Sequence, residues 1–134
     1  MTDRTEKTRP AVGAELFVSE TLVNVIADLG DGAYDSESPA TGMVTGQRFS
    51  DRLGTWATAL ALSYDENAED VVGWFRTSES NGLEMSDADV RRHVSLFGRV
   101  RSYAFMVDPS QSSFSIFTVE DGVPVKVRAL VSEN

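Results

Sequence analysis

Apolar residues follow two different periods along this chain, and the order in which these periods alternate constrains the fold more than any other feature. In two stretches they recur every three or four residues, which is typical of an amphipathic helix. Elsewhere they alternate or run continuously over the length of a strand. We predict strands over residues 15–18, 41–48, 55–63, 71–75, 102–107, 113–119 and 123–131, and helices over 20–29 and from Ser86 to Gly98. The resulting order, β-α-β-β-β-α-β-β-β, predicts an α/β (α+β) domain with helices packed on a sheet.

Two of the predicted strands should lie inside the sheet. Along 55–63, large residues such as Trp56 alternate with alanines such as Ala57, so both faces of this strand could be covered. The run Val71–Phe75 is apolar throughout apart from one glycine, and we expect it to be buried.

Serine and glycine residues predict where helices and turns begin and end. Ser19 is placed to cap the first helix, and Gly30 stands where a left-handed residue would end it. The stretch Asp31–Ala40 should then be a loop. Glu120-Asp121-Gly122 is typical of a tight hairpin. The second helix should bury one stripe, formed by Val90, Val94 and Phe97.

Length, charge and cysteine content narrow the classes of protein that fit. A length of 134 residues suits one domain, which we assign to 13–134, with 1–12 as a flexible polar lead-in. The net charge of −9 argues against a general nucleic-acid binder, because phosphate contacts need a basic face. The absence of cysteine excludes thiolate zinc sites and cysteine nucleophiles. The sequence has no apolar leader and no run long enough to cross a bilayer, so we expect a cytoplasmic protein without a membrane partner.

One segment carries the spacing of a known motif. Val71–Ser78 is followed by seven residues and then by Ser86-Asp87-Ala88-Asp89. This resembles the JAMM signature of the MPN (JAB-type) domain family, in which a strand ending in an aromatic residue runs into His-x-His, and Ser-x-x-Asp follows after seven residues. In that register Arg76 and Ser78 stand at the two histidine positions. Ser86 and Asp89 match the serine and the aspartate of the family.

The similarity extends to both sides of this segment. Pro39–Gly46 is similar to a family segment in which a glutamate precedes a Gly-x-apolar-x-Gly strand, and Pro39 takes the place of that glutamate. Ala104–Pro109 looks like the family's strand that ends in Asp-Pro. The match covers residues 15–120, and it implies an MPN-like mixed β-sheet flanked by helices.

The resemblance also implies that the zinc-hydrolase site of the family has been lost. A catalytic zinc needs about three protein ligands, an open position and a carboxylate to move protons. Of the ligands only Asp89 remains, and a guanidinium at position 76 cannot ligate metal because it stays protonated. Glu37 or Glu79 could be proposed as the carboxylate, but each lies in a polar loop where a solvated acid is the ordinary expectation. We therefore expect no catalytic residue, no metal and no cofactor, and we treat five residues as degenerate JAMM positions that line the former substrate groove: Pro39, Arg76, Ser78, Ser86 and Asp89.

Two interpretations fit Ser86 and Asp89. Ser-x-x-Asp is close to a capping box and would start the second helix without any site. The sharper hypothesis is that Arg76 pairs with Asp89, so that a guanidinium fills the space left by zinc and ties the strand end to the helix.

The single histidine and the large aromatic residues have ordinary structural interpretations. His93 lies four residues after Asp89 and so on the same helix face, but two ligands are too few for a catalytic zinc, and we expect a partly exposed helix histidine. Four aromatic residues fall on apolar stripes and should belong to the core: Trp56, Trp74, Phe75 and Phe97.

Three functions follow from this resemblance. Family members without the metal motif commonly serve as structural partners, so the first is a non-catalytic MPN-like domain that assembles with another MPN domain, with itself or with another protein. The second is a pseudoenzyme that binds a peptide or a ubiquitin-like C-terminal tail in the former groove, where Arg76 would suit a carboxylate. A metal-dependent isopeptidase or peptidase ranks last, because it demands ligands that the sequence lacks.

Overall fold

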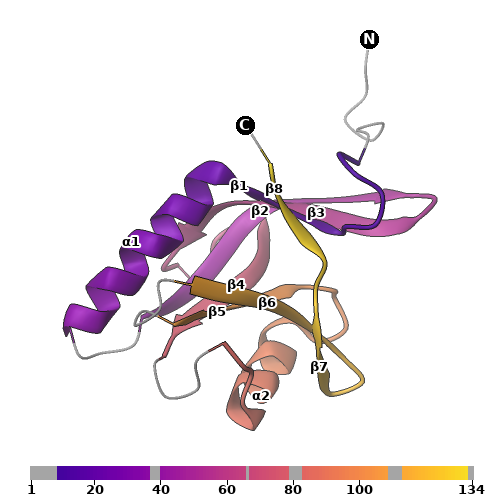
Figure 1. Ribbon diagram of the computed structural model, residues 1–134. Coiled ribbons are helices and arrows are strands. Elements are labelled where there is room, and N and C mark those ends of the chain that lie inside the picture. The colour runs from indigo at the N-terminus through magenta and orange to yellow at the C-terminus, as the bar shows by residue number, and fades with distance from the viewer. Residues whose placement is uncertain (1–8, 37–39, 66, 79–82, 109–112, 133–134) are drawn as a thin grey trace.

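The helices and strands predicted from the apolar pattern are present in the computed structural model, except that the last predicted strand is divided in two (Figure 1). The structure describes residues 9–36, 40–65, 67–78, 83–108 and 113–132, with the backbone alone for 29–36. The strands are β1 (Leu16–Ser19), β2 (Thr41–Asp51), β3 (Gly54–Ser63), β4 (Val71–Thr77), β5 (Tyr103–Asp108), β6 (Ser113–Glu120), β7 (Val123–Lys126) and β8 (Ala129–Ser132). The helices are α1 (Glu20–Ser36) and α2 (Asp87–Phe97). The predicted α+β class is confirmed. None of the helices described is long and apolar enough to span a membrane.

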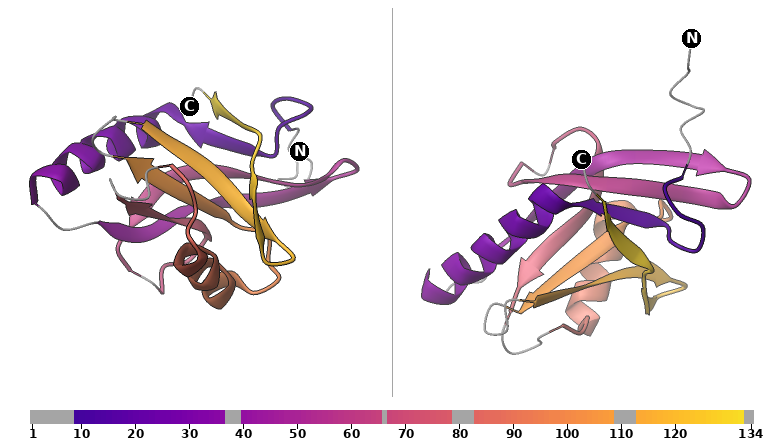
Figure 2. Two further views of the ribbon diagram at one scale, coloured as in Figure 1. Left: turned by 60° about the horizontal axis from the view of Figure 1, so that its bottom comes forward. Right: turned by 45° about the horizontal axis from the view of Figure 1, so that its top comes forward.

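The strands of the described residues form an eight-stranded mixed sheet in the order β7-β6-β5-β4-β2-β3-β1-β8. Its two edge strands, β7 and β8, follow each other in the chain and are separated only by Val127 and Arg128. The Val127 N–H donates to the Ile116 carbonyl (3.0 Å) beside one edge, and the Glu15 N–H donates to the Arg128 carbonyl (3.1 Å) beside the other. The sheet therefore curls until both edges meet one segment of chain, as Figure 2 shows.

The prediction of a single strand over 123–131 is wrong, because this stretch forms two strands on opposite edges of the sheet. β7 pairs antiparallel with β6, and β8 pairs parallel with β1. An apolar run shows that a segment is extended, but the partner of each residue is set by the curl of the whole sheet.

The sheet has one face inside the curl and one outside. The inner cluster joins Leu22 and Ile26 of α1 to strand residues that range from Leu16 of β1 to Ile116 of β6. On the outer face, α2 covers a cluster that contains Met43, Trp74, Ala104, Met106 and Phe117. A third cluster, around Phe17 and Trp56, lies under Ala11 and Phe49. Trp74 therefore marks the sheet face on which α2 lies.

The first helix is longer than the sequence pattern predicts. Ser19 does cap it, since its Oγ accepts a hydrogen bond from the Leu22 N–H (3.0 Å). The helix then continues through Gly30 to Ser36, so the predicted end at Gly30 and most of the predicted loop 31–40 are wrong. A glycine permits a left-handed helix end but does not impose one, and inside a helix it costs only about 1 kcal/mol relative to alanine.

The ends of the second helix and of the last hairpin are confirmed. Ser86 is the N-cap of α2, and Gly98 follows its last residue with a φ of 58°. Asp121 and Gly122 both have positive φ, 53° and 79°, which is the geometry of a tight hairpin turn between β6 and β7. The buried stripe of α2 differs from the prediction, because Val94 is 45% exposed whereas Asp89 and His93 are buried.

Candidate functional site

The β4 strand places Arg76 on the sheet face that α2 covers. Arg76 lies between Thr41 of β2 and Met106 of β5 in the strand register, and it is two residues after Trp74. Residues two apart on a strand share a face, so the Arg76 side chain emerges beneath the start of α2. The side chain is only 9% exposed.

Arg76 and Asp89 form a buried ion pair, as the sharper sequence hypothesis predicts. The Arg76 Nη2 lies 2.8 Å from the Asp89 Oδ2, and the Arg76 Nε lies 3.3 Å from both carboxylate oxygens. The same Nη2 donates to the Glu84 carbonyl (2.7 Å) in the segment that leads into α2. One guanidinium therefore connects the end of β4 to the start of α2 and to the residues before it.

Asp89 also completes the capping box of α2. Its Oδ2 accepts a hydrogen bond from the Ser86 N–H (2.9 Å), and its own N–H donates to the Ser86 Oγ (3.1 Å). Burial by itself would raise the pKa of Asp89, but hydrogen bonds from Arg76 and Ser86 more than offset it and hold the pKa below its ordinary value. Both interpretations of the Ser-x-x-Asp segment thus hold at once, and they share one carboxylate.

Of the two remaining degenerate JAMM positions, the structure describes Ser78 but not Pro39. Ser78 follows the last residue of β4, where its N–H donates to the Val107 carbonyl (2.9 Å). Pro39 lies outside the described residues, as do Glu37 and Glu79. The structure therefore brings three of the five positions together, namely Arg76, Ser86 and Asp89.

His93 is buried, at 3% exposure, so the prediction of a partly exposed histidine is wrong. Its Nδ1 accepts a hydrogen bond from the Trp74 Nε1 (3.1 Å), and the Arg92 guanidinium lies 5.3 Å from the centre of the Trp74 ring. Burial lowers the pKa of His93 to about 4, so the ring is neutral at pH 7. The sequence did contain a signal for this contact. Trp74 shares a strand face with Arg76, and His93 lies one helix turn after Asp89, so an Arg76–Asp89 pair also brings Trp74 and His93 together.

Three of the four aromatic residues assigned to the core are fully buried: Trp56 and Trp74 are 1% exposed and Phe75 is 0% exposed. Phe97 is only partly buried and packs against the outer cluster under α2.

The side chains at this site do not fit a catalytic zinc. Within the described ranges, no group of three or more histidine, cysteine or acidic residues is close enough to hold a metal ion. Asp89 already accepts hydrogen bonds from Arg76 and Ser86, and the Nδ1 of His93 is bonded to Trp74. The guanidinium adds a positive charge where a cation would have to bind.

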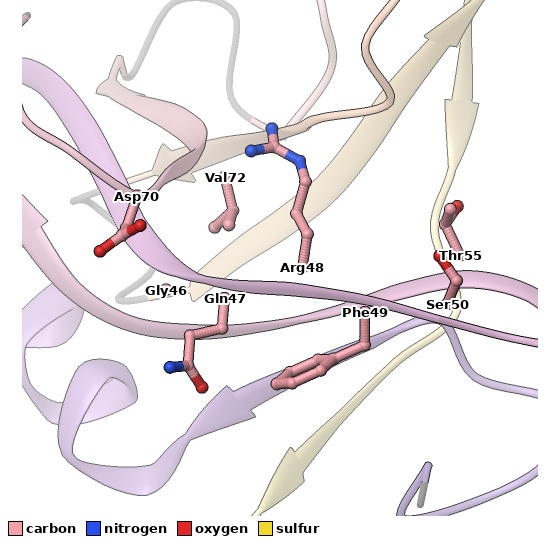
Figure 3. Close-up of a pocket in the computed structure, with 8 residues that line it drawn as sticks. All are labelled: Gly46, Gln47, Arg48, Phe49, Ser50, Thr55, Asp70 and Val72. Carbon is pink, nitrogen blue, oxygen red and sulfur yellow. The ribbon is translucent and has the colours of Figure 1, made fainter. Parts of the chain in front are cut away.

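A second feature, which sequence reasoning missed, is a pocket of about 790 Å³ at the far end of β2 (Figure 3). It is lined by Gly46, Gln47, Arg48, Phe49, Ser50, Thr55, Asp70 and Val72. The Arg48 side chain is fixed by hydrogen bonds to the Val71 carbonyl (2.6 Å) and the Ser102 Oγ (2.7 Å). The pocket arises because β2 continues to Asp51, beyond the predicted end of this strand at Arg48, whereas its neighbour β4 starts only at Val71.

Comparisons with known proteins identify the fold. No family model and no curated protein matches the sequence. A JAB1/MPN domain protein from Archaeoglobus fulgidus matches with a TM-score of 0.55 and 15% identity, over 84% of this chain and 97% of its own. A protein from Desulfitobacterium hafniense, solved in solution, matches with a TM-score of 0.62 and 10% identity, over 90% of this chain and 94% of its own. Identities this low concern the fold alone, and on that evidence the chain has an MPN-like fold.

Proposed function

We propose that this chain is a non-catalytic MPN-like domain that serves as a structural partner in a protein assembly. The observation that carries this proposal is the Arg76–Asp89 ion pair, at 2.8 Å, in the register where the family resemblance puts a metal ligand and the motif aspartate. A guanidinium bound to that aspartate neutralises the carboxylate with one positive charge and has no Lewis acidity. What remains of the motif then holds a helix onto a sheet.

Exposed aliphatic residues support a role in assembly. Val25 on α1, Leu60 on β3, and Leu130 and Val131 on β8 are between 41% and 59% exposed. β3, β1 and β8 are neighbours in the sheet, and α1 packs against β3 and β8. Adjacent residues of a strand point to opposite faces, so Leu130 and Val131 expose aliphatic surface on both faces at this edge of the sheet.

The buried state of Arg76 disfavours the tail-binding alternative. A peptide carboxylate would have to displace Asp89 from the guanidinium, and the Arg76 side chain is only 9% exposed. Breaking a buried pair in this way leaves an uncompensated charge and costs several kcal/mol.

The proposal is tested by purifying the tagged protein from its native cells at moderate salt and identifying by mass spectrometry what remains bound. We expect a partner at fixed stoichiometry, an intact JAMM protein or another stable subunit, that co-elutes with the chain in size-exclusion chromatography. In parallel, the purified chain is dialysed against zinc and its metal content is measured. Stoichiometric zinc at this site, or cleavage of an isopeptide-linked ubiquitin dimer, would refute a non-catalytic role. Recovery of only small proteins with free C-terminal tails would favour the groove-binding alternative instead.

A further inference from the structure

The β2 strand extends past the strand that covers one of its edges. β4 pairs only with Thr41–Thr45, whereas β3 pairs with β2 as far as Asp51. On the β4 side, the last backbone hydrogen bond that the structure describes for β2 runs from the Gly46 N–H to the Asp70 carbonyl (2.9 Å). In the part of the chain that the structure describes, residues 47–51 therefore have a neighbouring strand on one side only.

The backbone polar groups of Arg48 and Ser50 point to this open side. Alternate residues of a strand direct their N–H and C=O groups to the same side, and Gly46 donates on the β4 side. The hairpin to β3 gives the same result independently. Asp51 and Gly54 flank its two-residue turn, so they form the hydrogen-bonded pair, and the neighbouring Ser50 faces away from β3. Among the residues that the structure places, the N–H and C=O groups of Arg48 and Ser50 therefore have no strand partner on this side.

The side chains around this edge favour a ligand with an acidic group. Within the described part of the chain, the Arg48 guanidinium donates to two neutral oxygens, the Val71 carbonyl and the Ser102 Oγ. Three of its five N–H groups are then available to a ligand. Among the described residues, no carboxylate forms an ion pair with it. Figure 3 shows Arg48 and Val72 on one side of the β2 ribbon and Gln47 and Phe49 on the other, so both faces of an added strand would meet side chains.

We propose that the open edge of β2 beyond Gly46 binds an extended peptide segment of a partner protein, which pairs with Arg48 and Ser50 and places an acidic side chain against the Arg48 guanidinium. Main-chain hydrogen bonds to a strand edge supply affinity, and the side-chain charge selects the peptide. A second copy of this chain is the competing occupant, since residues 47–51 carry one positive and one negative side chain, and binding that depends on protein concentration would reveal it. The site lies at the opposite end of β2 from Thr41, the neighbour of Arg76, so it does not depend on the proposed role of the JAMM-like motif.

The test uses the full chain labelled with nitrogen-15 and three synthetic peptides, blocked at both ends, with the sequence Thr-Val-Thr-X-Thr-Val-Thr and Glu, Gln or Lys at X. With the Glu peptide we expect shifts of the amide signals of residues 47–51 and slower hydrogen exchange at Arg48 and Ser50. The affinity should fall in the order Glu, Gln, Lys, by roughly fivefold from first to last. No change at these amides with any peptide, or equal affinity for all three, would overturn the proposal.

Variants separate the backbone contribution from the charge. Ser50→Pro removes an N–H from the open edge, where proline is tolerated, and should weaken binding roughly tenfold. Ser50→Ala is the matched control, keeps the N–H and should bind as the unaltered chain does. Arg48→Gln should remove the preference for Glu over Lys. If Ser50→Pro and Ser50→Ala bind alike, or if the edge signals depend on protein concentration rather than on peptide, the site is not a peptide-binding edge. None of these outcomes bears on zinc content or on the assembly partner, so the two proposals fail separately.

Discussion

Four side chains join α2 to the outer face of the sheet through two matched contacts. Trp74 and Arg76 are two residues apart on β4, and their partners His93 and Asp89 are one turn apart on α2. Each contact joins polar groups that are shielded from water, so each group would be costly to bury without its partner. The residues of the JAMM-like segment therefore act in this chain as a fixed attachment between strand and helix.

Arg76→Met should lower the free energy of unfolding by about 2–4 kcal/mol, because it leaves the Asp89 carboxylate buried without its counter-charge. Adding Asp89→Asn to that variant should restore part of the loss, since an amide at position 89 carries no charge and can still cap the Ser86 N–H. Denaturation in urea measures four proteins: the unaltered chain, Arg76→Met, Asp89→Asn and the double variant. Arg91→Met, at an exposed position of α2, is the control and should change little. Simple additivity of the two substitutions at positions 76 and 89 would contradict a coupled pair.

The second attachment should make stability depend on pH. The pKa of His93 is about 4 in the folded chain, against an ordinary value of 6.5, so between these values the unfolded chain holds a proton that the folded chain excludes. Stability should be flat above pH 6.5 and fall as the pH drops from 6.5 to 4, by at most about 3 kcal/mol.

The control for this pH dependence is direct, because His93 is the only histidine in the sequence. His93→Gln should flatten the profile between pH 4 and 6.5 while keeping a side-chain acceptor for Trp74. A histidine ring that titrates near 6.5 in the folded chain, observed by nuclear magnetic resonance, would contradict the buried hydrogen bond.

At the scale of the elements, the sequence predicted a helix start or a hairpin turn correctly where residues next to each other in the chain determine it. Ser86 caps α2 because its hydroxyl accepts the Asp89 N–H, and the turn at Asp121 and Gly122 needs only positive φ at two residues. Gly30 was misleading because the same residue type is compatible with a helix end and with a helix interior. The buried stripe of α2 was predicted wrongly for a different reason. Its polar residues are buried only because β4 supplies partners for them, and Val94 is left exposed.

One substitution made at two glycines tests the revised boundary of α1. Gly30→Ala should stabilise the chain by about 0.5–1 kcal/mol, because alanine is the better residue inside a helix. Gly98→Ala should instead destabilise it by about 1 kcal/mol, since Gly98 has a φ of 58° although its surroundings leave space for a methyl group. Thermal unfolding followed by circular dichroism measures both. Destabilisation by Gly30→Ala would mean that the helix ends at that residue in solution.

At the scale of the whole molecule, the sequence predicted the class and order of the elements but neither the curl nor the pocket. The burial of β4 could be predicted, because its residues are apolar on both faces. The same expectation for β3 is only partly right, since Trp56, Ala57 and Ala59 are buried but Leu60 is exposed. The splitting of 123–132 into β7 and β8 could not, since it depends on where β6 and β1 lie in the closed sheet. The open edge of β2 likewise exists only because β4 starts at Val71, beside Thr45. Features that depend on the pairing of strands distant in the sequence cannot be predicted from the residues of one strand alone.

The junction of the two sheet edges is held by charges as well as by backbone. The Arg101 Nε and Nη2 donate to the two carboxylate oxygens of Glu15 (2.7 and 3.0 Å), and its Nη1 donates to Glu120 (2.7 Å). Glu15 precedes β1, and Glu120 ends β6, so one guanidinium spans the two sides that β7 and β8 connect. These hydrogen bonds raise the pKa of Arg101 above its ordinary value, so it stays charged at every pH that the fold tolerates.

Arg101→Met should therefore loosen the closed sheet as a whole. We expect a loss of about 1 kcal/mol, a modest value because the Arg101 side chain is 35% exposed and solvent screens its ion pairs. Urea denaturation is the suitable measurement, since urea is uncharged and salt can be varied independently. In 1 M salt the difference from the unaltered chain should shrink. Arg99→Met, at an exposed position two residues earlier, is the matched control and should be neutral at every salt concentration. If both variants respond alike, the charges around Arg101 do not hold the edges together, and the backbone pairing of Val127 and Arg128 closes the sheet alone.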